Sequence, residues 1–106
     1  MKPELQQALD EARARLRALY GDRLQHVILY GSQARGDAGP ESDVDVLVVL
    51  NGPFNMYQEI KRLVRLDRDL FERYRLDFSF QPYNEETYQD LRRPFIQNVH
   101  SDGVEL

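Results

Sequence analysis

Two short apolar runs, separated by a polar segment, constrain the fold more than any other feature of the sequence. The first run ends in Val27-Ile28-Leu29-Tyr30, and the second is Val46-Leu47-Val48-Val49-Leu50. Short runs that are rich in β-branched residues and bounded by turn residues predict buried strands, here over residues 24–30 and 46–50. The second run is the longest in the chain, yet it is far shorter than the roughly 20 apolar residues of a transmembrane helix. We therefore expect no membrane span.

Apolar residues at helical spacing before and after these runs predict two long helices. Each helix carries one apolar stripe, formed by Leu5, Ala8, Leu9, Ala12, Leu16 and Leu19 in residues 3–20 and by Met56, Ile60, Leu63, Val64, Leu70, Phe71 and Tyr74 in residues 55–74. Residues 75–81 alternate strictly between apolar and polar side chains, which predicts a third strand with Asp77 on its polar face.

The last part of the chain predicts a short helix capped by Asn84, a helix from about Pro94 to Gly103, and a short final strand over residues 104–106. Helices and strands in this order predict one α/β domain over residues 1–106, in which helices flank a small mixed β-sheet.

Composition excludes several classes of function. The 106-residue chain is 42% hydrophobic, which suffices for a modest core, and it contains no cysteine. Disulfides, thiolate zinc sites and thiol nucleophiles are therefore excluded. The formal net charge of -4 argues against unspecific nucleic-acid binding, so we expect no direct nucleic-acid partner. No apolar stretch follows the charged start of the chain, and we expect a cytoplasmic protein.

Three aspartates stand at positions to which strands would bring them. Asp43 and Asp45 are two residues apart, so their side chains project from the same face of a strand. Asp77 follows on a later strand, and pairing of neighbouring strands would bring it beside them. Carboxylates that share one face repel each other unless a cation lies between them, and Mg²⁺ is the natural candidate for oxygen ligands. Such a site holds one or two metal ions for displacement at phosphorus.

A phosphate-binding turn is predicted next to these acids. Gly31-Ser32 follows the strand that ends at Tyr30, and a short helical turn over the next residues would present backbone N–H groups and the Ser32 hydroxyl. Arg35 adds a cation that can neutralise phosphate oxygens. Taken singly, Gly31-Ser32 is equally compatible with an ordinary strand-ending turn, and the acids with solvated positions, but together they favour a nucleotide site.

At these residues the chain resembles the minimal nucleotidyltransferases of the DNA polymerase β-like superfamily. The family pattern is Gly-Ser, ten residues, Asp-x-Asp, and a third Asp on a later strand. It is matched by Gly31-Ser32, residues 33–42, Asp43-Val44-Asp45, and Asp77. The extended form Gly31-Ser-Gln-Ala-Arg-Gly36 followed by Ser42-Asp43 resembles the antitoxins of bacterial minimal-nucleotidyltransferase/HEPN pairs.

The resemblance implies a fold, an activity and a partner. It implies the polymerase β-like fold, with Asp43, Asp45 and Asp77 as catalytic metal ligands and Gly31 and Ser32 holding the triphosphate of ATP. Asp77 is the candidate general base. The implied reaction is Mg²⁺-dependent transfer of AMP to a hydroxyl, of tyrosine in the leading hypothesis, on a HEPN ribonuclease toxin. The toxin is thereby neutralised and forms an oligomer with this chain.

Two other functions remain open at this stage. One is a non-catalytic antitoxin that masks its partner by binding, against which the intact set of carboxylates argues. The other is a small-molecule nucleotidyltransferase. Such enzymes bind the acceptor with a second domain, and the absence of one in 106 residues argues against this function.

Overall fold

The computed structural model describes residues 2–106. Its helices are α1 (Pro3–Tyr20), α2 (Ser32–Arg35), α3 (Met56–Tyr74), α4 (Glu85–Tyr88) and α5 (Pro94–Asp102), with a 3₁₀ turn η1 (Gly21–Arg23), and its strands are β1 (Leu24–Tyr30), β2 (Val44–Leu50), β3 (Phe78–Asn84) and β4 (Val104–Glu105). Both apolar runs thus form strands, as predicted, and the structure pairs these strands with each other. No helix of this part of the chain is long and apolar enough to cross a membrane.

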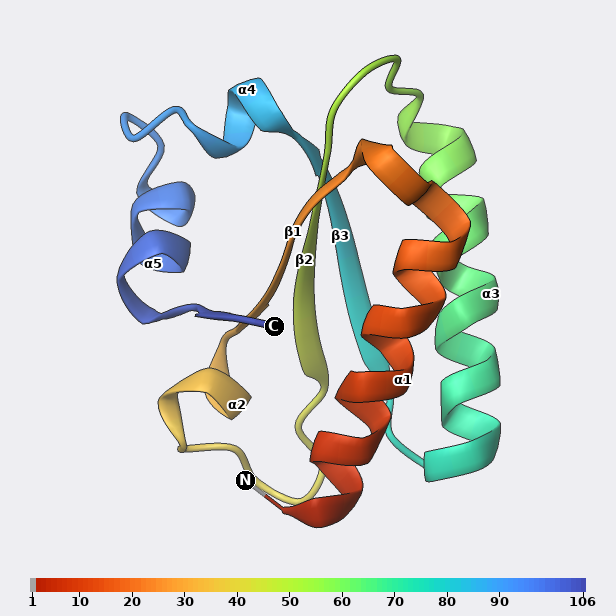
Figure 1. The fold of residues 1–106 in the computed structure, drawn as a ribbon. Helices are drawn as coiled ribbons and strands as arrows, with labels where there is room; N and C mark the ends of the chain where they lie inside the picture. The colour runs from red at the N-terminus through yellow and green to blue at the C-terminus, as the bar shows by residue number, and fades with distance from the viewer. Residues whose placement is uncertain (1) are drawn as a thin grey trace.

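The four strands form one mixed sheet in the order β3-β2-β1-β4. Strand β1 runs antiparallel to both β2 and β4, whereas β2 and β3 are parallel. The predicted α/β architecture with a small mixed sheet is therefore confirmed. In Figure 1, α1 and α3 cover one face of the sheet, and α4 and α5 lie on the other.

Strand β2 is the centre of the hydrophobic core, which explains its unbroken apolar run. Val44, Val46 and Val48 pack with α1 and α3, whereas Leu47 and Val49 pack on the opposite side with Tyr88 and Val99, which come from α4 and α5. A strand that is covered on both faces needs apolar side chains at successive positions rather than at every second one.

The third strand begins and ends later than its alternating pattern predicts. It spans Phe78–Asn84 rather than residues 75–81, and it continues through Pro82. Strand β3 lies at the edge of the sheet, so one side of its backbone has no neighbouring strand. In the parallel register with β2, the backbone nitrogen of Pro82 points to this free side. Proline has no N–H to donate, but at this position no hydrogen bond to β2 is lost.

Helix α3 buries a different stripe from the predicted one. Leu63, Leu66 and Leu70 face the core, whereas four members of the predicted stripe (Met56, Ile60, Val64 and Phe71) are exposed. The buried side also contains Glu59, whose side chain is 2% exposed. Arg23 and Arg62 donate hydrogen bonds to the two oxygens of this carboxylate at 3.0 and 2.9 Å, so a charged residue replaces an apolar one in the buried stripe.

Candidate active site

Gly31 forms a turn that only glycine adopts readily, at the end of β1. Its dihedral angles are φ 76° and ψ -155°, and α2 begins at the next residue, Ser32. A Cβ atom added at Gly31 would overlap Oδ2 of Asp45 and lie 3.2 Å from its Cγ. The turn therefore rests directly against one of the predicted metal ligands.

Asp43 and Asp45 flank the first residue of β2. Val44 is fully buried, and because side chains alternate along a strand, both aspartates project from the other face of the sheet. Asp45 is half-buried and pairs with Tyr30 across the antiparallel ladder. Burial, followed by the nearby charge of Asp43, raises the pKa of Asp45, whereas Arg35 acts in the opposite direction. The two carboxylates and the Arg35 guanidinium thus share one electrostatic environment.

The segment between the turn and the acid pair folds back on itself. Ser42 closes a tight turn, since its N–H donates to the Gly39 carbonyl at 3.2 Å and its Oγ accepts from the Gly39 N–H at 2.9 Å. Within this segment Arg35 Nε lies 3.4 Å from Asp37 Oδ2, and both side chains are exposed. The ten residues between Ser32 and Asp43 therefore connect the end of β1 to the start of β2, where Asp45 pairs with Tyr30.

Asp77 lies beside this pair, one residue before β3. The Val44 N–H donates to the Asp77 carbonyl at 2.8 Å, and Asp45 stands in register with Ser79. Paired residues of parallel strands face the same way, so Ser79 shares the face of Asp45, and Asp77 continues that alternation. The sequence predicted Asp77 within a strand; the structure places it in the exposed approach to the strand, at the same end of the sheet as Asp43.

Asp67, on α3, also belongs to this region, although no sequence pattern indicated it. Its Oδ1 accepts the Phe78 N–H at 2.8 Å, which fixes the first residue of β3 directly after Asp77. The pKa of Asp67 is raised, chiefly by burial and further by the charges of Asp77 and Asp43, although the Phe78 N–H opposes the shift. In the sequence Asp67 lies among alternating charges that are typical of an exposed helix face, so no local pattern distinguished it.

The donor set at this end of the sheet fits a hard divalent cation. Within residues 2–106, no three Asp, Glu, His or Cys side chains lie close enough together to enclose a metal ion. Mg²⁺ does not need such a cage, because it retains water and is commonly held by one or two carboxylates together with substrate phosphates. Asp43 and Asp45 meet that requirement, and burial together with the charge of Asp43 raises the pKa of Asp45.

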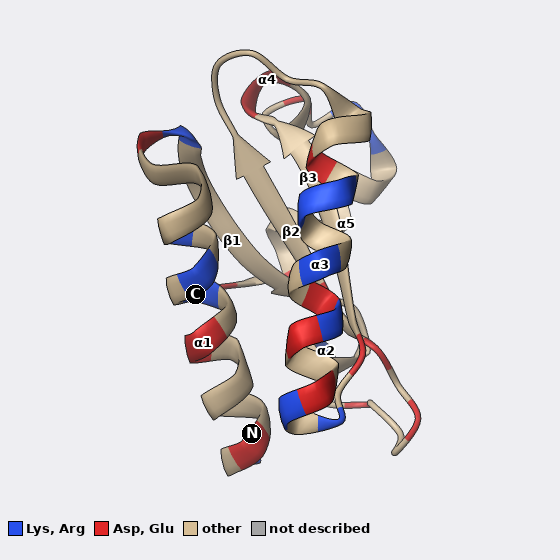
Figure 2. Ribbon diagram, turned by 90° about the vertical axis from the view of Figure 1, so that its right-hand side faces the viewer, with Lys and Arg blue, Asp and Glu red and all other residues tan. Residues whose placement is uncertain are grey.

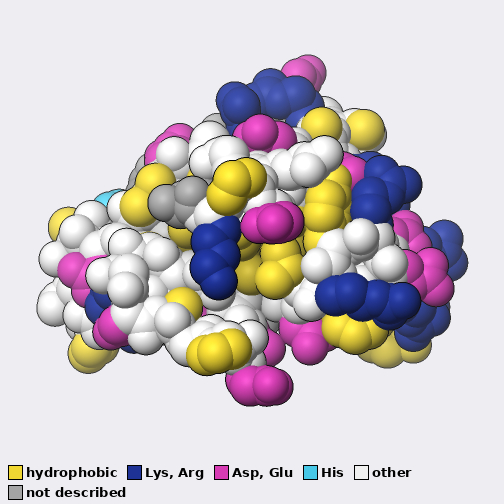
Figure 3. All heavy atoms as spheres, turned by 90° about the horizontal axis from the view of Figure 1, so that it is seen from below, with side chains coloured by type: hydrophobic (Ala, Val, Ile, Leu, Met, Phe, Trp, Pro, Cys, Tyr) yellow, Lys and Arg dark blue, Asp and Glu magenta, His cyan; other side chains and the backbone are white. Residues whose placement is uncertain are grey.

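Aromatic side chains border the acids on the α5 side. The ring of Tyr30 meets that of Phe95 edge to face at 5.4 Å, and Tyr83 lies 5.8 Å from the same ring. Burial and the charge of Asp45 raise the pKa of Tyr30 to about 12, so this phenol stays protonated at neutral pH. Figure 3 views this end of the molecule from below, where acidic and basic side chains border exposed hydrophobic ones.

Comparison with known proteins links this geometry to one family. The sequence profile described as a nucleotidyltransferase domain matches residues 9–102. A protein of Methanocaldococcus jannaschii named "Putative protein adenylyltransferase MJ0604" is 43% identical over 99 residues, which cover 92% of this chain and 93% of that protein.

Two solved structures share the fold. One, described as a toxin–antitoxin with AMP-PNP, has a TM-score of 0.62 and 20% identity, and the match covers 91% of this chain and 70% of that one. The other, a tri-AMPylated Shewanella oneidensis HEPN toxin in complex with an MNT antitoxin, has a TM-score of 0.54 and 19% identity over 94% of this chain and 70% of the matched one.

Proposed function

This chain belongs to the nucleotidyltransferase domain family, and from that premise we propose that it transfers AMP from ATP, with Mg²⁺, to a hydroxyl group of a HEPN ribonuclease toxin. We propose tyrosine as the acceptor residue, and neutralisation of the toxin as the result. One observation carries the proposal: the glycine turn after β1 contacts Asp45, and the backbone of Asp77 pairs with that of Val44. The candidate phosphate-binding turn and the chain segments that carry Asp43, Asp45 and Asp77 thus lie at the same end of the sheet.

The turn supplies the binding site for the triphosphate. Gly31 lets phosphate oxygens approach the backbone closely because it has no side chain, and Ser32 offers a hydroxyl. Arg35 is exposed, and its weak 3.4 Å contact with Asp37 leaves the guanidinium able to turn toward a phosphate oxygen.

The carboxylates hold the metal and receive the proton. Asp43 and Asp45 would hold Mg²⁺ together with phosphate oxygens of the nucleotide, and Asp77 would act beside them. The bound ion supplies Lewis-acid stabilisation of the charge that develops on the phosphate oxygens. Burial, followed by the charge of Asp43, raises the pKa of Asp45, and a cation held beside the two carboxylates would offset that shift.

The reaction is an in-line displacement at the α-phosphorus of ATP. The acceptor oxygen forms a bond to that phosphorus while the bond to the bridging oxygen of the β-phosphate breaks, and pyrophosphate leaves. Asp77 takes the proton of the acceptor hydroxyl, for which its exposed position beside Asp43 suits it. The product is an AMP-modified acceptor.

The partner is proposed on the basis of the comparisons. The related protein of M. jannaschii is named for protein adenylyl transfer, one structural neighbour holds AMP-PNP, and the other contains an AMPylated HEPN toxin. AMP adds negative charge and bulk to the toxin, which would oppose RNA binding. We place the reaction in the cytoplasm, where ATP is the available donor, and we expect an oligomer of this chain with the toxin.

A labelling experiment tests the proposal. The protein is incubated with ATP labelled at the α-phosphate, Mg²⁺ and the product of the neighbouring gene, and label on that product is measured together with its ribonuclease activity. Asp43→Asn is expected to lower the transfer rate by on the order of a thousandfold, because several kcal/mol of charge stabilisation are lost.

Glu41→Gln is the matched control, since it removes one charge from the same exposed segment without touching the proposed ligands. It should keep the wild-type rate. Inhibition of the toxin without label would show masking rather than transfer, and a normal rate in Asp43→Asn would refute the metal role of Asp43.

A further inference from the structure

A groove on the outer side of the molecule gathers positive charge in a protein that is acidic as a whole. It has a volume of about 450 Å³ and lies between α1 and α3, away from the face of the sheet from which the acids of the site project. Four cations line it, namely Arg15, Lys61, Arg62 and Arg65. No acidic side chain belongs to its lining, although acids outnumber bases by 18 to 14 in the sequence.

Repulsion between cations on α3 lowers the stability of this helix. Lys61 and Arg65 are four residues apart, so two like charges lie on adjacent turns. Within residues 2–106 neither has a carboxylate within ion-pair distance, whereas Arg15 is paired with Asp69 at 2.8 Å and Arg62 with the buried Glu59 at 2.9 Å. Figure 2 shows basic residues on the part of α3 that belongs to the groove and mixed charges farther along the helix.

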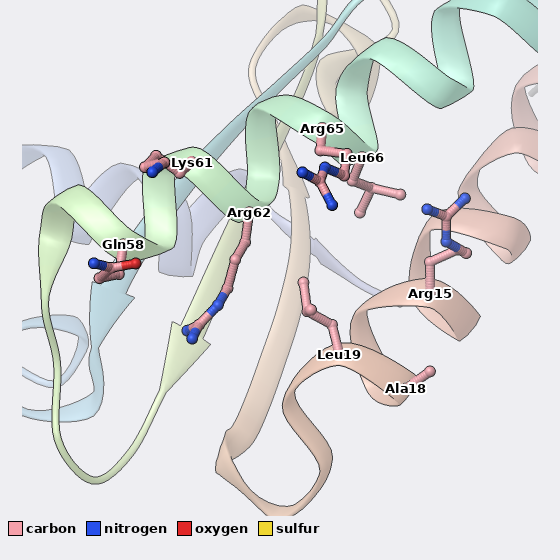
Figure 4. Close-up of a pocket in the computed structure, with 8 residues that line it drawn as sticks. All are labelled: Arg15, Ala18, Leu19, Gln58, Lys61, Arg62, Arg65 and Leu66. Atoms are coloured by element: carbon pink, nitrogen blue, oxygen red, sulfur yellow. The ribbon is translucent and has the colours of Figure 1, made fainter.

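The groove also has an apolar floor. Leu19 of α1 is 44% exposed, and Leu66 of α3, which is only 3% exposed, closes the bottom of the groove. In Figure 4 Leu19 and Arg62 extend from the two helices into the space between them, and Arg15 and Arg65 extend toward the same space. An exposed leucine bordered by cations suits a ligand that carries both apolar and negatively charged groups.

We propose that this groove is the docking site for an acidic amphipathic helix of a partner protein. The partner's apolar stripe lies against Leu19, above the buried Leu66, and its flanking Asp or Glu side chains pair with Lys61 and Arg65. Two packed helices offer the kind of shallow groove that an amphipathic helix fills. Nucleic acid fits less well, because no lining residue is aromatic and the neighbouring Tyr57 ring already contacts Lys61, whose Nζ lies 5.3 Å from its centroid.

A designed peptide serves as the probe. It has about 18 residues, which form five helical turns, with leucine at positions i, i+3, i+4 and i+7 and glutamate at the flanking positions. Binding of the fluorescein-labelled peptide is measured by anisotropy at low and at physiological salt. We expect saturable binding that weakens as salt rises, and no binding of the same peptide with lysine in place of glutamate.

Two double variants carry the same change in net charge. Lys61→Glu/Arg65→Glu reverses the free cations of the groove and should weaken peptide binding at least about tenfold. Arg13→Glu/Arg17→Glu reverses two exposed cations of α1 that do not line the groove and should leave the affinity unchanged.

Equal affinity in the two variants, or no binding of the glutamate peptide, would overturn the proposal. Tighter binding of a single-stranded oligonucleotide than of the peptide would do the same. So would a wild-type dimer that Lys61→Glu/Arg65→Glu dissociates, because the groove would then belong to a second copy. Binding of the peptide needs neither ATP nor a toxin, so failure of AMP transfer would leave this result standing.

Discussion

Gly31→Ala tests the contact between the turn and the acid pair more directly than any other single change. The substitution adds one methyl group at a residue with φ 76° and ψ -155°, a region that is essentially reserved for glycine. Holding alanine there costs about 1–3 kcal/mol. The new Cβ also overlaps Oδ2 of Asp45, so the Asp45 side chain must leave its rotamer at a further cost of about 0.5–1.5 kcal/mol.

The two contributions separate in a double-mutant cycle. Asp45→Ala removes Oδ2 and Cγ and leaves only Cβ, at an ordinary contact distance of 3.4 Å, so the second contribution should vanish in Gly31→Ala/Asp45→Ala while the backbone cost remains. The free energy of unfolding is measured by urea titration for all four proteins. We expect a coupling of about 0.5–1.5 kcal/mol between the two sites, the size of the rotamer cost.

Gly36→Ala is the matched control for backbone strain. Gly36 has φ 81° in the left-handed region, but an added Cβ would meet no atom within 4 Å. It should therefore lose about 1–2 kcal/mol of stability and keep its AMP-transfer rate, whereas Gly31→Ala loses both stability and transfer. Equal transfer rates in the two variants, or a coupling near zero, would refute the contact as an element of the site.

Two further predictions concern the buried Glu59 and the half-buried Asp67. Glu59→Ala should lower the free energy of unfolding by about 3 kcal/mol, since Arg23 and Arg62 lose their shared partner. Although burial alone would raise the pKa of Glu59, hydrogen bonds, chiefly from Arg23, hold it below its ordinary value. Its stabilisation is therefore complete above that ordinary value and is lost as pH falls through the lower, folded pKa; Glu59→Gln should flatten this acid limb in urea titrations across pH. Ionisation of Asp67 has the opposite effect on stability. Because its pKa is raised in the folded protein, the charged form at neutral pH lowers the free energy of unfolding. Asp67→Asn should thus be at least as stable as the wild type at neutral pH, whereas Asp67→Ala, which leaves the Phe78 N–H without its acceptor, should be about 1 kcal/mol less stable.

Features that depend on local periodicity could be predicted from the sequence. The apolar runs before Tyr30 and after Asp45 predicted two strands at nearly their observed bounds, because burial on both faces leaves a continuous apolar signal. The helix over residues 3–20 was predicted equally well, since its apolar stripe, apart from Leu19, faces the core.

Features that depend on tertiary neighbours could not be predicted. Periodicity could not show that α3 buries Glu59 and exposes Ile60, because the arginine that helps to neutralise Glu59, Arg23, lies far away in the sequence. The shift of β3 to Phe78–Asn84 depends likewise on its place at the sheet edge, where Pro82 is tolerated.

The candidate site shows the same division. The spacing between Gly31 and Asp43 placed the turn and the acids on consecutive strands, but their contact follows from the antiparallel pairing of Tyr30 with Asp45. Asp67 was missed because its interaction is with a backbone N–H eleven residues away, a contact that no motif records.

Pro82, in the edge strand β3, affects whether molecules of this protein aggregate by β-sheet pairing. A sheet grows from molecule to molecule when its last strand offers free N–H groups to an incoming strand. On β3 the position of Pro82 offers none, and Asp67 already takes the N–H of Phe78. Intermolecular β-pairing is thus blocked at two points along this strand, so abundant expression should not drive the chains into fibrils through this border.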